Sequence, residues 1–96
     1  MKTITSVGTG PHSFKVGENY NFQVSIKNLA AGETAQVLLL PANSDSTITL
    51  EDVVTTSDLV VFEVGHADTV QVEKTGGGAF QNAQTTVTFS RWWRAV

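Results

Sequence analysis

The segment Asn19–Lys27, which reads NYNFQVSIK, decides the fold class of this chain. Its apolar residues occupy every second position, at Tyr20, Phe22, Val24 and Ile26. Successive side chains of a β-strand point to opposite faces of a sheet, so this spacing places one face on a core and the other in water. The segment is therefore predicted to be a half-buried strand with Tyr20 on its inward face.

Shorter segments of the same character fill the rest of the chain. Turn-forming residues separate them, and Gly17-Glu18 is expected to form a hairpin turn. Residues 51–58 fit either a loop or a single helical turn. The other predicted strands cover residues 3–7, 12–16, 33–40, 47–50, 59–64, 69–74 and 84–93. About seven or eight short strands predict one all-β domain over residues 1–96, an antiparallel β-sandwich, with a partly open barrel as the alternative arrangement.

Composition limits the classes of partner. The six Lys and Arg residues are scattered and the net charge is −3, so nucleic acid is not expected as a partner. The longest apolar runs, Val37–Leu40 and Leu59–Phe62, have the length of a strand, so no membrane insertion is expected. A chain without cysteine has no disulfide and no thiolate chemistry. The first residues lack a signal-peptide pattern, which predicts synthesis in the cytoplasm.

Two histidines, His12 and His66, lie beside predicted turns. A catalytic or metal-binding histidine needs convergent partners, and neither residue has one at motif spacing. Both are therefore interpreted as surface or capping histidines.

Four acidic residues fall within one loop-rich stretch. They lack the spacing of a calcium-binding loop, and nothing selects two of them as a catalytic pair, so solvated loop charges are the favoured interpretation. These residues are Asp45, Glu51, Asp52 and Asp58. No catalytic residue, metal ligand or cofactor is predicted, and the chain is expected not to be an enzyme.

The glycine run Gly76-Gly77-Gly78 is not a phosphate-binding loop. It lacks the Lys-Ser/Thr pair and the helix start that hold a phosphate. The run is instead predicted to be a flexible connection that could become ordered on contact with a neighbouring molecule.

The C-terminal residues 91–96 are the strongest candidate for a contact with a partner. If the last strand reaches Trp93, then Trp92 and Trp93 point to opposite faces. One can close the end of the core, and the other can cover the outer face under an arginine stem or meet a partner. Trp and Arg are enriched among the residues that dominate binding energy at interfaces. The predicted contact residues are Arg91, Trp92, Trp93 and Arg94.

The pattern Val-Gly-Glu-x-Tyr-x-Phe-x-Val-x-Ile over residues 16–26, followed by an aliphatic strand and a long C-terminal strand, resembles immunoglobulin-like modules that lack the disulfide. The chain is similar to small domains of this kind in tailed-phage particles. The resemblance implies a capsid decoration, connector or fibre-associated protein. Its partners would be copies of itself or other virion proteins, and it would be incorporated in a virion. The alternative is a carbohydrate-binding or adhesion module, with Tyr20, Trp92 or Trp93 contacting a glycan.

Overall fold

A computed structural model describes residues 2–17, 20–41, 47–55, 57–61 and 69–93, with the backbone alone described for residues 51–52 and 57–61. These residues form strands and connecting turns, and no helix. The strands are β1 (Lys2–Val7), β2 (His12–Lys15), β3 (Tyr20–Lys27), β4 (Ala35–Leu40), β5 (Ile48–Val54), β6 (Ser57–Val61), β7 (Thr69–Lys74) and β8 (Thr86–Trp93).

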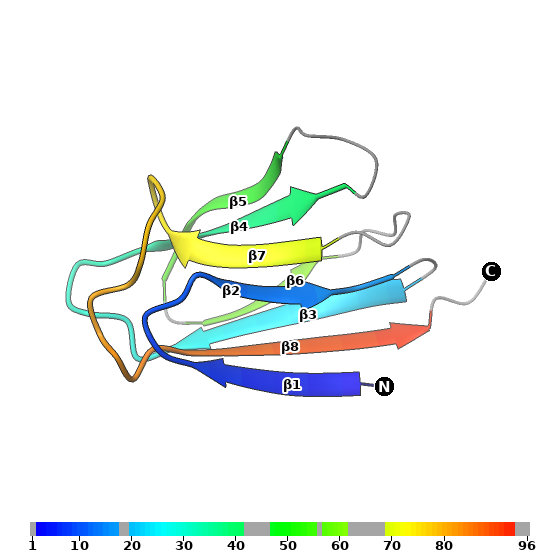
Figure 1. Cartoon of the computed structure of the whole chain (residues 1–96), viewed down its shortest axis with the longest axis horizontal. Coiled ribbons are helices and arrows are strands. Elements are labelled where there is room, and N and C mark those ends of the chain that lie inside the picture. Colours follow the sequence, from blue (N-terminus) through cyan, green and yellow to red (C-terminus); the bar gives the residue numbers. More distant parts are fainter. Residues whose placement is uncertain (1, 18–19, 42–46, 56, 62–68, 94–96) are drawn as a thin grey trace.

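The strands form two four-stranded sheets that pack face to face (Figure 1). One sheet has the order β1-β8-β3-β6 and the other the order β2-β7-β4-β5. Every pairing is antiparallel. The predicted antiparallel β-sandwich is confirmed, and the strands lie in two separate sheets rather than in a partly open barrel.

The core lies between the sheets and follows the alternation of the sequence. Phe22, Val24 and Ile26 of β3 are buried, as their spacing predicted. Their neighbours on β8 are Val87 and Phe89, which are also fully buried. Further core residues come from the other sheet, namely Phe14, Ala35, Val37, Leu39, Val54, Val70 and Val72.

Two predictions about the backbone are wrong, and each has a physical reason. Gly17 does not begin a hairpin between adjacent strands, because β2 pairs with β7 while β3 pairs with β8 and β6. The chain crosses from one sheet to the other after β2, and Gly17 takes a positive φ of 90° there. Residues 51–54 are strand, because register shifts between Ala35 and Leu38 let β5 continue along β4. Such a bulge interrupts the two-residue period that sequence patterns depend on.

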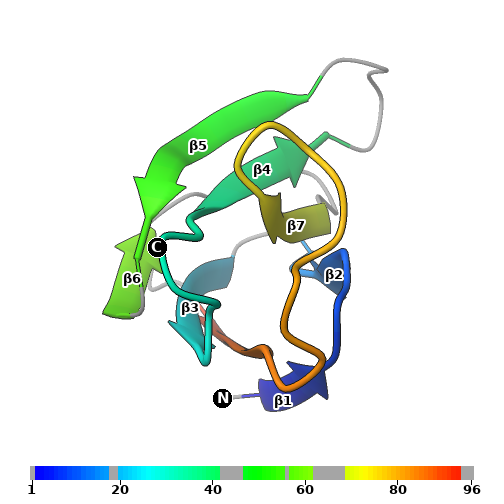
Figure 2. The same cartoon turned by 90° about the vertical axis from the view of Figure 1, so that its left-hand side faces the viewer.

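His12 is buried rather than on the surface, and it caps the turn between β1 and β2. Its Nε2 donates to the carbonyl of Gly8 at 3.1 Å, and its Nδ1 lies 2.7 Å from the Ser6 hydroxyl. The segment that connects β7 to β8 crosses this end of the sandwich (Figure 2). It buries Phe80, whose ring centroid lies 6.0 Å from that of His12. The imidazole therefore joins two segments that are far apart in sequence.

Gly10 tests this arrangement. It has a φ of +72°, and a Cβ there would lie 2.7 Å from the His12 Cδ2. Gly10→Ala should lower the free energy of unfolding by about 2–4 kcal/mol, because strain in the left-handed region adds to a steric clash. Gly32→Ala is the matched control, since Gly32 has a φ of +76° but open space around it, and it should lose only about 1 kcal/mol. Urea unfolding of both variants measures the difference. Equal losses would contradict the packing of His12 against Gly10.

Candidate interaction site

The C-terminal half of β8 carries most of the predicted contact residues. Val87 and Phe89 face the core, so Arg91 and Trp93 continue the inward series and Trp92 lies on the outer face. The prediction that the two tryptophans point to opposite faces is confirmed. Trp92 is half-buried, whereas Trp93, at the open end of the sandwich, is 62% exposed. Arg94 lies outside the described residues.

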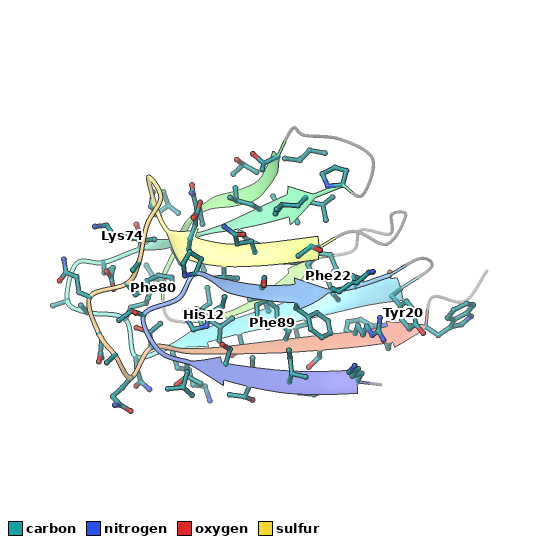
Figure 3. The ribbon with its side chains drawn as sticks, in the orientation of Figure 1. His12, Tyr20, Phe22, Lys74, Phe80 and Phe89 are labelled. Carbon is teal, nitrogen blue, oxygen red and sulfur yellow. The ribbon has the colours of Figure 1, made fainter. Side chains whose placement is uncertain are left out.

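Arg91 is half-buried and contacts residues of its own chain. Its guanidinium lies 4.5 Å from the ring centroid of Tyr20 and 5.9 Å from that of Phe14. Its Nη1 donates a hydrogen bond to the carbonyl of Val16, which ties β8 to the end of β2. Cation–π contacts of this kind gain strength when water is excluded. The Arg91 side chain therefore fills the space between the two sheets at this end. Figure 3 shows the labelled Tyr20 beside the end of β8.

Trp93 rests on the same tyrosine from the other direction. Tyr20 and Trp93 are cross-strand neighbours, and their ring centroids lie 5.3 Å apart with an interplanar angle of 89°. Edge-to-face packing of this kind is favourable for aromatic pairs. Tyr20 thus contacts both Arg91 and Trp93. The contact orders the Trp93 ring while leaving most of its surface open.

The outer face beside Trp92 is polar. Along β1 and β8, the Thr3 and Ser90 hydroxyls lie 3.1 Å apart and those of Thr5 and Thr88 3.4 Å apart. The next strand, β3, adds side-chain amides and a hydroxyl at Asn21, Gln23 and Ser25. Hydroxyl and amide groups therefore cover this face across the neighbouring strands β1, β8 and β3.

Exposed large apolar side chains lie at the margins of the sandwich, and apart from Trp93 they were not predicted from the sequence. Among the described residues they are Ile4 (37% exposed), Val7 (58%), Ile48 (49%), Val53 (63%) and Trp93 (62%). Ile4 and Val7 belong to β1, and Ile48 and Val53 belong to β5. Each of these strands is one of the two edge strands of its sheet. The exposed apolar side chains of the described residues therefore lie along two sheet edges and at the end of β8.

Gly76-Gly77-Gly78 forms a turn after β7. The turn is closed by a bond from the Gly77 amide to the Lys74 carbonyl, and by one from the Lys74 amide to the Gly78 carbonyl. All three glycines have φ near +90° to +99°, which explains the composition of the turn.

The acidic residues are divided between the two sheets. Glu51 and Asp52 lie within β5, and Asp58 lies within β6, so these three are not loop residues. Asp45 and His66 fall outside the described residues.

In the described part of the chain there is no cluster of three or more His, Cys, Asp or Glu residues and no pocket. The same residues contain no helix able to span a membrane.

Substitution of Arg91 tests whether its side chain stabilises the fold or is a free surface contact. Arg91→Ala should lower the free energy of unfolding by about 1–3 kcal/mol, because the Val16 carbonyl loses its donor and the Tyr20 ring loses its cover. Lys15→Ala is the control on an exposed strand position, and should change stability by less than about 0.5 kcal/mol. Denaturant unfolding measures both. An unchanged denaturant midpoint for Arg91→Ala would contradict a stabilising role between the sheets, and Arg91 would then be a surface residue.

Comparisons with models of protein families, with curated proteins and with solved structures found no match.

Proposed function

We propose that this chain is a non-enzymatic structural module that assembles through protein–protein contacts. The observation that carries the proposal is the position of the exposed apolar side chains on edge strands β1 and β5 and at Trp93. Sheet edges present unpaired N–H and C=O groups, and monomeric proteins protect them with charges, proline or bulges. Strand β1 has no proline and a single charge, at Lys2. An edge of this composition is suited to contact with another chain.

Trp93 is the second element of the proposed contact surface. A large aromatic side chain that enters a partner's surface contributes strongly to binding. Its packing against Tyr20 orders the ring before a partner arrives, which reduces the entropy lost on binding. Arg91 supports this contact indirectly, because it holds the Tyr20 ring in place from between the sheets.

The narrower role that we propose is that of a virion protein, as a capsid decoration, connector or fibre-associated domain. Its support is the resemblance of residues 16–26 and the following strands to small tailed-phage domains. Copies of this chain or other virion proteins would be the partners.

A glycan-binding role is the alternative, and the geometry gives it less support. Tyr20 and Trp93 lie at nearly a right angle to each other, and Trp92 lies on the opposite face of β8. The three rings therefore do not form one flat platform of the kind that stacks on a sugar.

Trp93 tests the proposed contact. Trp93→Ala should weaken self-association of the chain about tenfold or more, because an exposed aromatic anchor is removed while the fold loses little. Light scattering over a concentration series measures the association constant. Trp92→Phe is the matched control, since it keeps an aromatic ring on the other face and leaves Trp93 as the sole indole.

The Trp92→Phe control also separates the two functions by acrylamide quenching of Trp93. Assembly predicts that quenching falls as protein concentration rises. If the chain stays monomeric and only an added oligosaccharide protects Trp93 from acrylamide, glycan binding is supported and assembly is contradicted.

A further inference from the structure

We infer that strand β1 is a self-complementary edge that pairs with β1 of a second copy around a two-fold axis at Thr5. The inference rests on the proposed function and names the partner and the register of one contact. Its starting point is the position of β1, which forms the margin of its sheet in both views (Figures 1 and 2). Among the described strands, only β8 pairs with it.

The backbone register identifies which groups of β1 are unpaired. The amide of Gly8 donates to the carbonyl of Thr85 at 2.9 Å, so Gly8 directs its backbone groups toward β8. Backbone groups alternate in direction along a strand. Those of Ile4 and Ser6 therefore also face β8, while those of Thr3, Thr5 and Val7 face the open edge. Three N–H and three C=O groups are thus available for a further strand.

A two-fold axis at Thr5 uses all of these groups. Thr5 then lies opposite Thr5 of the second copy, and Thr3 lies opposite Val7. Each such pair can exchange two hydrogen bonds, as alternate pairs do in an antiparallel ladder. Lys2 falls opposite Gly8, so no like charges meet. Val7 gains the methyl group of a threonine as a neighbour, which covers an exposed valine.

The other edge strands are less suited to this pairing. Strand β5 is irregular, because of its register shifts, and carries Glu51 and Asp52. Strand β2 has four residues, and β6 has five with Asp58 among them. Bulges, charges and shortness are the usual protections of a sheet edge. Strand β1 has six residues, with no bulge in its pairing to β8 and no charge over residues 3–7. Pairing there would join two four-stranded sheets into one continuous sheet.

Charges placed at the axis test the register. Thr5 lies on the outer face opposite Thr88, so Thr5→Lys and Thr5→Glu can be made without disturbing the core. In each variant two like charges would face each other across the axis, and the dimer dissociation constant should rise about fivefold. A 1:1 mixture should restore association, with the mixed dimer favoured about tenfold over either variant alone. Thr88→Lys and Thr88→Glu are the controls on the neighbouring strand, and mixing them should give no such preference.

Thr5→Pro tests the backbone contact separately. The Thr5 amide faces the open edge, so proline there removes no bond to β8 but removes a donor from each copy. Dimerisation should weaken about tenfold or more, while circular dichroism confirms the fold. If Trp93→Ala weakens association and no Thr5 variant does, the β1 contact is overturned and the proposed assembly function stands. If the unmodified chain does not associate at any concentration, both are overturned.

Discussion

The structure depends on the inward face shared by β3 and β8. These two strands pair over their full length, from Tyr20 opposite Trp93 to Lys27 opposite Thr86, and their alternate residues form the floor of the core. Across the interior, the ring of Phe14 stacks on Phe89 with centroids 5.3 Å apart. Burying a phenylalanine contributes about 1.5–3 kcal/mol through apolar area, so these contacts hold the second sheet on the first.

A sandwich that covers its two inner faces leaves its edges and ends uncovered. At one end the chain resolves this with His12, Phe80 and the segment that crosses from β7 to β8. At the other end a cation, Arg91, fills the gap between the sheets and supports Tyr20, which in turn carries Trp93. The lateral edges differ from both ends, since β1 and β5 keep exposed aliphatic side chains. Side chains therefore cover the core at the two ends, where the chain crosses between the sheets. The edge strands β1 and β5 stay uncovered, and a sheet edge is where a further strand can pair.

Much of this fold could be predicted from alternation alone. The two-residue period located β3 and the inward set on β8, and it fixed β7 at Thr69–Lys74. The same period also predicts that Arg91 points inward, because it lies two residues after Phe89 and four after Val87. Its charge nevertheless suggested a contact at the surface. Pairing could not be predicted, because a local pattern does not say which sheet a strand joins. Gly17 therefore looked like a hairpin turn, and the edge position of β1 appeared only with the strand order.

Residue-resolved amide hydrogen exchange of β1 over a concentration series tests the central claim most directly, because it reports on the edge groups themselves. The amides of Ile4 and Ser6 point to β8 and should be protected at every concentration. The amides of Thr3, Thr5 and Val7 should exchange freely in dilute protein and become protected as concentration rises. Exchange of these three amides at the same unprotected rate in dilute and concentrated protein would contradict assembly through this edge.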